Sequence, residues 1–287
     1  MAVGGTKVNP KKFRANQIPI YLYSIPIAVF MGLPIVFIIC HAFKPVNELF
    51  AFPPKIFVSN PTFENFKRLF NYASSGSIPF SRYIFNSLIS TGSIVILSIL
   101  ISTMAGFALS KFRFRRKENI MTINNLALMF VATAVTIPRY LVISVLGIEN
   151  TYLAHILPVI AMPVGLFLVK QFIDQVPNEL LEAAQMEGAG PWQIYRKIIL
   201  PMIRPAVMTC AILAFQSAWG NTETSSLFTT TDSIRTLAFY MSTLSTDTIQ
   251  GTGMTAAAGL IMFIPNLLLF IVMQSNVMNT MARSGLK

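Results

Sequence analysis

Long apolar stretches separated by shorter polar segments dominate the pattern of this chain. A helix needs about 20 apolar residues to cross a hydrocarbon layer roughly 30 Å thick. Six stretches approach that length: Ile18–Phe43, Ser87–Leu109, Ile120–Ile143, Tyr152–Ile173, Pro205–Trp219 and Thr255–Gln274. The fifth is short, and the third contains Asn124, Asn125 and Arg139. The pattern predicts an all-α membrane protein with six transmembrane helices.

The composition supports this prediction. Hydrophobic residues make up 54% of the chain and charged residues only 11%, with a mean hydropathy of +0.61. Soluble globular domains carry roughly 25% charged residues, so this composition excludes an ordinary soluble protein. The chain is expected to be a multi-pass membrane protein.

Lysine and arginine fall mainly on one side of the predicted spans, and cytoplasmic segments are the ones enriched in these residues. That side holds Lys7, Lys11, Lys12, Arg14, Lys111, Arg113, Arg115, Arg116, Lys117, Lys170, Arg196, Lys197, Arg204, Arg283 and Lys287. The other side holds Lys44, Lys55, Lys67, Arg68, Arg82 and Arg235. We therefore expect both termini in the cytoplasm. The net charge of +11 reflects this orientation, and no nucleic-acid partner is expected.

The spans divide the chain into five parts. Residues 1–17 form a cytoplasmic N-terminal segment, 18–43 the first transmembrane helix and 44–86 an extracytoplasmic loop. Residues 87–274 form a five-helix core that contains a cytoplasmic loop over 174–204, and 275–287 form a cytoplasmic tail. Thr62 is the expected N-cap of a short helix within the extracytoplasmic loop. A loop of this length offers exposed surface to an external partner. The alternative is that it only packs over the ends of the helices.

No catalytic or metal site is evident in the sequence. The two histidines, His41 and His155, lie far apart in different spans, and no cluster has metal-ligand spacing. No nucleophile motif of the G-x-S-x-G type and no phosphate-binding G-x-x-x-x-G-K-[ST] motif occurs. The chain is predicted not to be an enzyme and to bind no cofactor, so any ATP that powers it would be hydrolysed by another chain.

The most informative motif lies in the loop between the fourth and fifth spans. It reads Glu182-Ala183-Ala184-Gln185-Met186-Glu187-Gly188 and continues nine residues later as Ile198-Ile199-Leu200-Pro201. Small residues at Ala183 and Ala184 allow close approach of a partner surface, Gly188 permits a sharp turn between two short helices, and Pro201 is expected to open the next membrane helix. The alternative is an ordinary amphipathic helix-turn-helix between two spans.

The spacing E-A-A-x-x-x-G-x9-I-x-L-P resembles the cytoplasmic loop of the membrane subunits of binding-protein-dependent ABC importers. Over nearly its whole length the chain is similar to the shorter permease subunit of the maltose-type carbohydrate importers. Further matches are Asn86-Ser87, Ala105-Gly106-Phe107-Ala108-Leu109, Ile137-Pro138, Asn150-Thr151-Tyr152, Gly165-Leu166-Phe167-Leu168, Phe172 and Pro177. Departures are Trp219-Gly220-Asn221-Thr222-Glu223, where relatives have Trp-Asn before an apolar run, and the tail Ser284-Gly285-Leu286-Lys287.

The resemblance implies a type I importer permease fold and a heteromeric complex in a bacterial cell (inner or plasma) membrane. The implied partners are a second homologous permease, two ABC ATPase subunits that use ATP and Mg²⁺, and an extracytoplasmic solute-binding protein. In the loop, Glu182 would contact a basic residue of the ATPase, Ala183 and Ala184 would form the close-approach face, and Gly188 would form the turn. Met186 would fill an apolar groove of the ATPase or pack against its own helix, and Glu187 and Pro201 complete the coupling loop.

Polar residues within spans are costly and often face a cavity, which makes them candidates for the substrate pathway. They are Asn124, Asn125, Arg139, His155, Gln216, Trp219 and Asn221. The alternative is that each forms hydrogen bonds between helices. Arg139 could extend toward the membrane surface, or it could bind the carboxylate of an acidic sugar.

Three functions compete at this stage. The first is the permease subunit of an importer for a sugar, oligosaccharide or polysaccharide. The second is an importer permease for another solute, such as a polyamine or phosphate ester. The third, a secondary transporter, would require buried coupling carboxylates that the central spans do not contain.

Overall fold

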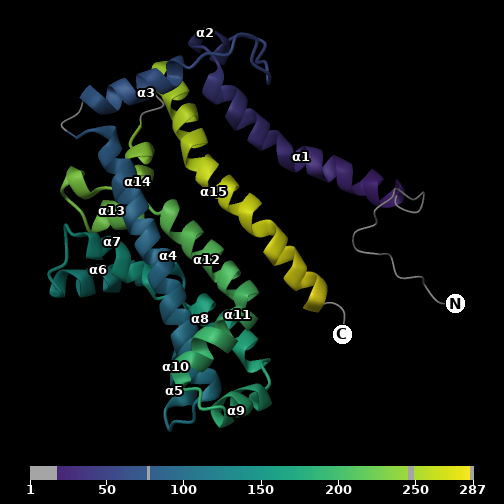
Figure 1. The fold of residues 1–287 in the computed structure, drawn as a ribbon. Coiled ribbons are helices and arrows are strands. Elements are labelled where there is room, and N and C mark those ends of the chain that lie inside the picture. Colours follow the sequence, from purple (N-terminus) through teal and green to yellow (C-terminus); the bar gives the residue numbers. More distant parts are fainter. Residues whose placement is uncertain (1–17, 76–77, 245–248, 285–287) are drawn as a thin grey trace. The chain divides into compact units, whose positions relative to one another are not determined.

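The computed structural model describes residues 18–75, 78–244 and 249–284, and all regular elements in these ranges are helices (Figure 1). The all-α prediction is therefore confirmed. The basic N-terminal segment and the last three residues of the tail lie outside the described residues.

Three continuous helices are long and apolar enough to cross a membrane. They are α1 (Ile18–Phe43), α4 (Phe80–Lys111) and α15 (Ile249–Ser284). The predicted first span coincides with α1. The second extends further toward the N-terminus than predicted, because Pro79 is its N-cap and the first turn starts at Phe80.

Two further spans are bent pairs of helices. α7 (Tyr152–Ile160) and α8 (Pro163–Asp174) meet at 46°, where Pro163 begins the second helix. The short helices between Pro191 and Met202 meet α12 (Arg204–Trp219) at 80°. If each bent pair counts as one span, the described part of the chain has up to five spans by length and composition.

The third predicted span differs from the prediction of one continuous helix. Residues 117–145 form α5 (Lys117–Ala127), a 3₁₀ turn η2 (Ala132–Val135) and α6 (Thr136–Val145). Pro138 lies in the first turn of α6, a position that proline tolerates because its missing N–H has no partner there. The proline therefore starts a new helix, and the interruption prevents one uniform span.

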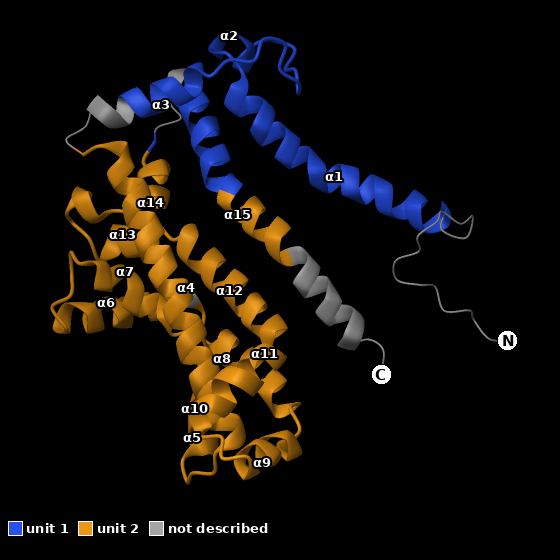
Figure 2. Cartoon of the chain, viewed as in Figure 1, with its two compact units in different colours: residues 1–72, 244–264, 281–287 blue, residues 73–243, 265–280 orange. Residues whose placement is uncertain are grey.

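The chain forms two compact units, which are coloured separately in Figure 2. The unit formed by residues 73–243 and 265–280 is organised around α4, which packs against α7, α8 and α12. The buried face of α4 is rich in small side chains: Ser87, Ser90, Ser98, Ser102, Thr103 and Gly106. A β-carbon at Gly106 would lie 3.0 Å from Val169 Cγ1 of α8. Small residues thus let these helices approach closely, as is usual in membrane bundles.

The other unit contains residues 1–72, 244–264 and 281–287. The loop after α1 folds back on the end of that helix, because Thr62 N–H donates to Phe43 O at 2.8 Å. The loop carries α2 (Val46–Leu49) and leads into α3 (Glu64–Ser75). Thr62 Oγ1 accepts a hydrogen bond from Glu64 N–H at 3.2 Å, in agreement with its predicted capping role.

One carboxylate closes this loop. Glu48 accepts hydrogen bonds from Ser59 N–H at 2.9 Å and Asn60 N–H at 3.0 Å. The hydrogen bond from Ser59 N–H holds the pKa of the Glu48 carboxyl below its usual range. The two donors of Asn60 and the positive charge of Lys55 lower this pKa further.

Candidate functional site

The Glu182 motif lies mainly on α9 (Asn178–Met186), a short helix at one end of the unit built around α4 (Figure 1). Pro177 precedes the helix in an extended conformation, and Glu179 lies in the first turn, where a carboxylate interacts favourably with the helix dipole. Leu181 is buried and attaches α9 to the core, whereas Glu182 is exposed. The helix is thus amphipathic, with its charged face directed to the outside.

The two alanines of the motif do not lie on the same face. Ala183 is exposed, whereas Ala184 is half-buried and packs against the core. Met186 is 89% exposed, so it does not pack against its own helix. Of the predicted close-approach face, therefore, only Ala183 lies on the exposed side, where Met186 and Glu187 are also found.

Gly188 ends α9 with the backbone geometry that only glycine adopts easily. Its φ is +85°. Gly188 N–H donates to Gln185 O at 2.9 Å, and Ala189 N–H donates to Ala184 O at 2.9 Å. These two bonds form the Schellman motif, which satisfies the last carbonyls of a helix and reverses the chain. The turn predicted at Gly188 is present.

The segment after this turn contains α10 (Pro191–Ile194), a π-helical turn η3 (Tyr195–Ile199) and α11 (Leu200–Met202). Pro201 lies within α11, and α12 begins only at Arg204, with Pro205 in its first turn. The expectation that Pro201 opens the next membrane helix is therefore wrong. The chain needs one more turn, at Ile203, before the change of direction that starts α12.

A single apolar cluster joins this segment to the membrane helices. It contains Phe107 of α4, Val169 and Ile173 of α8, Leu181 of α9, Ile194, Tyr195 and Ile199 of the turn segment, and Ala206 and Cys210 of α12. The loop is therefore a packed part of the helical core and not a free connection.

Polar contacts add to this packing. The Tyr195 and Thr103 hydroxyls lie 2.8 Å apart and are buried. Thr103 Oγ1 also donates to Ile99 O at 2.7 Å, so the Tyr195 hydroxyl is the donor in their shared bond. At the end of α4, Lys111 Nζ donates to Val176 O at 2.6 Å and to Asn178 Oδ1 at 2.9 Å. Helix α4 thus holds the start of α9 and the π-helical turn in fixed positions.

Arg139, one of the predicted pathway residues, forms an ion pair that the sequence analysis missed. Its Nη1 lies 3.1 and 3.2 Å from the two carboxylate oxygens of Glu223, which begins α13 (Glu223–Leu227). Thr136 Oγ1 donates to the same carboxylate at 3.1 Å. The side chains of Arg139 and Glu223 are 26% and 32% exposed. An arginine in a span calls for a counter-charge, and the departure from the family pattern at Glu223 was the available signal.

Three other predicted pathway residues make hydrogen bonds that hold elements together. His155 is 1% exposed, and its ring nitrogens lie 2.9 Å from Thr224 Oγ1 and 3.2 Å from Ile234 O. Asn124 Nδ2 on α5 donates to the O atom of Pro163, the first residue of α8, at 3.2 Å. Asn221 Oδ1 accepts from Thr224 N–H at 3.0 Å at the start of α13. These contacts fit the alternative that such residues connect helices.

The remaining three predicted pathway residues are spread over two elements. Asn125 is exposed on α5, and Gln216 is exposed on α12. Trp219 is buried at the end of α12 and stacks on Phe215, with ring centroids 5.7 Å apart. The structure therefore does not bring the seven residues together at one site.

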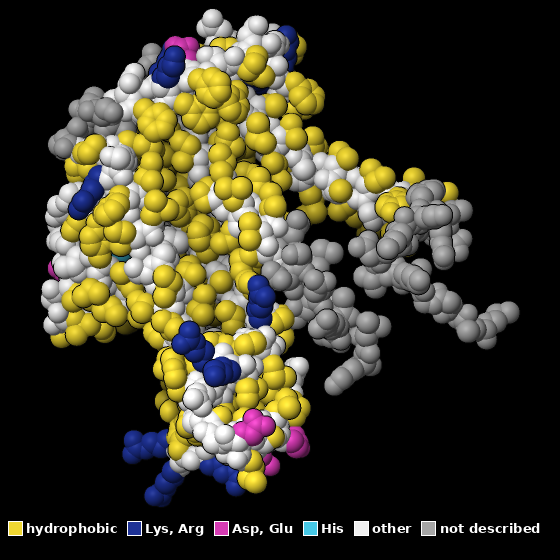
Figure 3. Space-filling view, viewed as in Figure 1, with side chains coloured by type: hydrophobic (Ala, Val, Ile, Leu, Met, Phe, Trp, Pro, Cys, Tyr) yellow, Lys and Arg dark blue, Asp and Glu magenta, His cyan; other side chains and the backbone are white. Residues whose placement is uncertain are grey.

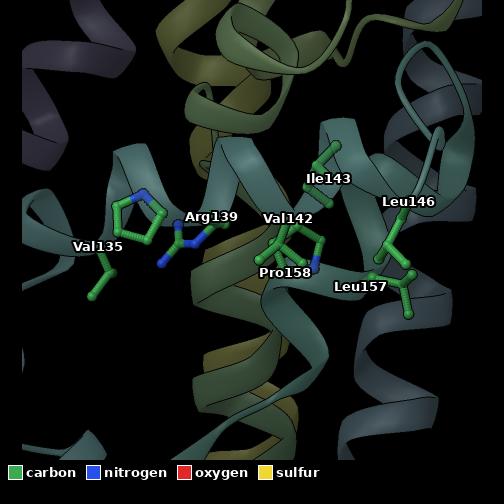
Figure 4. Close-up of a pocket in the computed structure, with 8 residues that line it drawn as sticks. Val135, Arg139, Val142, Ile143, Leu146, Leu157 and Pro158 are labelled. Atoms are coloured by element: carbon green, nitrogen blue, oxygen red, sulfur yellow. The ribbon is translucent and has the colours of Figure 1, made fainter.

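A cavity of about 320 Å³ lies beside Arg139 (Figure 4). Its lining is almost entirely apolar: Val135, Pro138, Arg139, Val142, Ile143, Leu146, Leu157 and Pro158. Arg139 is the single charged residue of this lining, and its charge is balanced by Glu223.

Comparison with known proteins adds the family context. The family model described as "Binding-protein-dependent transport system inner membrane component" matches residues 17–276. The diacetylchitobiose uptake system permease protein of Streptomyces coelicolor is 26% identical over 265 residues, which cover 91% of this chain and 94% of that protein. The galactooligosaccharides transport system permease protein of Bacillus subtilis is 28% identical over 270 residues, covering 93% and 94%.

A solved structure has the same fold. It is a crystal structure of a bacterial ABC transporter involved in the import of the acidic polysaccharide alginate, with a TM-score of 0.77 at 18% identity. The match covers 93% of this chain and 99% of that one. It confirms the fold predicted for this chain, a type I permease with several membrane helices.

Proposed function

Because the chain belongs to the family of binding-protein-dependent transport system inner membrane components, we propose that it is a permease subunit of an ATP-driven carbohydrate importer. It would form half of the translocation pathway for a sugar, oligosaccharide or polysaccharide. The diacetylchitobiose and galactooligosaccharides permeases, which it resembles over 94% of their length, carry the names of oligosaccharide systems, and this supports a sugar over a polyamine or a phosphate ester.

One observation carries the proposal beyond family membership. Helix α9 presents Glu182, Ala183 and Met186 outward, while Leu181 and the Schellman turn fix the helix to the core. An exposed methionine beside a carboxylate and a small residue forms a surface that suits a protein partner, because methionine adapts to apolar grooves. The partner would be an ABC ATPase, with Glu182 facing one of its basic residues.

The full importer would contain a second homologous permease, two ATPase subunits and an extracytoplasmic solute-binding protein. ATP and Mg²⁺ would be bound by the ATPase subunits. This chain would contribute no catalytic group. Its termini and α9 would face the cytoplasm, as the distribution of lysine and arginine predicts.

The packing of the loop suggests how ATP binding would move the pathway. When the ATPase dimer closes, α9 follows it, and the apolar cluster passes the displacement to α4, α8 and α12 together. Packed cores shift as rigid bodies because they deform little. The bond from Tyr195 to Thr103 and the bonds from Lys111 to Val176 and Asn178 would keep α4 in register with the loop.

Reconstitution tests the function. Proteoliposomes containing this chain, its partner permease and the ATPase should accumulate a labelled neutral oligosaccharide when ATP is inside and the loaded binding protein is outside. Liposomes that lack the ATPase serve as the control. Accumulation without the ATPase would indicate a secondary transporter. Uptake of a polyamine or phosphate ester with no uptake of any sugar would overturn the substrate class.

A further inference from the structure

The turn between α4 and α5 carries a cluster of unpaired positive charge. We call residues Phe112–Arg116 the arginine turn. Arg113, Arg115 and Arg116 are all exposed, and within the described ranges none of them forms an ion pair or a side-chain hydrogen bond. Such guanidinium groups are free to bind a ligand.

The start of the turn is attached to α4. Phe112 is extended, with φ −94° and ψ 150°, and its N–H donates to Ala108 O at 3.1 Å. The Phe112 ring packs edge-on against Phe107 of α4, with centroids 5.3 Å apart. Arg113 follows this anchored residue and is exposed.

The two other basic residues near the turn are already engaged. Lys111 donates to Val176 O and Asn178 Oδ1, and Lys117 Nζ lies 3.3 Å from Ser110 O, which closes the turn. Their bonds fix the base of the turn. The free charge is therefore that of the three arginines.

The turn lies where apolar surface ends. Before it, α4 is a continuous candidate span that ends at Lys111. After it, α5 exposes Ile120, Ile123 and Leu126. Helix α4 is long and apolar enough to cross a membrane, and α5 exposes these three apolar residues among polar ones such as Glu118 and Asn125. In a membrane, the turn at the end of α4 would therefore lie at the boundary of the hydrocarbon layer. Figure 1 shows where α4 gives way to α5, and the space-filling view in Figure 3 shows Lys and Arg side chains in the same region.

We propose that the arginine turn binds the phosphate groups of anionic phospholipids such as phosphatidylglycerol. Guanidinium groups bind phosphate oxygens in pairs, and each basic residue close to an anionic membrane surface strengthens binding roughly fivefold. The turn directly follows α4, a candidate membrane span, and this continuity favours a lipid as the occupant. The exposed face of α9 remains available to a protein partner.

Native mass spectrometry of the full chain, released from micelles that contain equal amounts of phosphatidylglycerol and phosphatidylcholine, tests the proposal. The wild-type chain should retain phosphatidylglycerol in preference to phosphatidylcholine. The variant Arg113→Gln/Arg115→Gln/Arg116→Gln should lose this preference by about a hundredfold, because three contacts of roughly fivefold multiply. Lysine at the three positions should restore part of it, since charge remains but paired hydrogen bonding does not.

The matched control is Arg196→Gln/Lys197→Gln, which removes exposed charge from the π-helical turn. It should keep the lipid preference. Equal lipid retention by the triple variant and the wild-type chain, or equal loss in the control, would overturn the proposal. Competition by millimolar glycerol phosphate would indicate a soluble phosphate site and also overturn it. If the triple variant does not fold, as judged by its thermal midpoint, the single change Arg115→Gln should still lower retention about fivefold.

Discussion

Gly188 is the position where the structure makes the most specific prediction about the coupling loop. Its φ of +85° is one that other residues adopt at a cost of roughly 1–2 kcal/mol, with asparagine the least affected and β-branched residues the most. A β-carbon built at Gly188 meets no described atom within 4 Å, so the chain itself offers no steric obstacle. Within this chain, the cost of a substitution therefore arises from the backbone.

This cost should appear as weaker docking of the ATPase. If the Schellman turn must be kept for α9 to dock, 1–2 kcal/mol corresponds to about 5- to 30-fold weaker binding for Gly188→Ala. Gly188→Asn should lose less than Gly188→Ala, and Gly188→Val should lose more. The assay is co-purification of the ATPase with each variant at matched expression in membranes.

The order of ATPase retention among the Gly188 variants distinguishes a backbone cost from a steric cost. If the close approach of the ATPase surface sets the cost, the loss follows side-chain volume, and alanine retains more ATPase than asparagine. That order would refute the backbone argument, and equal retention across all variants would remove the mechanical role of the turn. Gly190→Ala is the matched control, because Gly190 has a φ of −74° and open space around its α-carbon, so it should dock normally.

Four further predictions concern other parts of the chain. Glu182→Lys should abolish uptake and substrate-stimulated ATP hydrolysis while the permease still reaches the membrane, because loss of a desolvated pair costs about 2–5 kcal/mol; normal uptake would make the motif dispensable. A cysteine at Ser59 should react with an impermeant thiol reagent in intact cells, and labelling only after lysis would reverse the predicted topology. A double-mutant cycle of Arg139→Met and Glu223→Gln should give a coupling of about 1–3 kcal/mol, measured as non-additive shifts of the thermal midpoint, and additive shifts would contradict the ion pair. Because folding lowers the pKa of Glu48, its hydrogen bonds from Ser59 and Asn60 should be intact above about pH 4.3 and be lost as the pH falls through the pKa of the folded state. Faster amide hydrogen exchange at Ser59 would report this loss, and constant exchange down to about pH 2 would contradict the prediction.

The sequence predicted the fold well where one strong pattern acts alone. The first span is uninterrupted and apolar, and its ends match α1. Gly188 was identifiable because few residues other than glycine can occupy a left-handed turn after a helix. The helical class and the family followed from the same local signals.

The sequence could not predict the roles of residues whose partners are brought together only by tertiary packing. Asn124 and His155 were candidates for the pathway, yet each satisfies hydrogen bonds of neighbouring elements. Glu223 lies 84 residues from its partner Arg139, so no local pattern connects them. Pro201 likewise lies inside α11, next to Leu200, which packs against the apolar cluster that contains Tyr195. No local sequence pattern marks that packing.

Helix α4 is a continuous candidate span around which the unit of residues 73–243 and 265–280 is organised, and other segments of the chain bind to it near both of its ends. Near Phe80, Asn86 donates to Ser233 O and Arg235 O, and at the other end Lys111 holds the start of α9. At 1.5 Å per residue its 32 residues span about 48 Å. A rod of that length amplifies angle into distance, so pivoting by about 5° displaces the far tip by about 4 Å, more than the length of a hydrogen bond. Small rotations imposed at one membrane face would therefore be enough to break or make whole sets of contacts at the other.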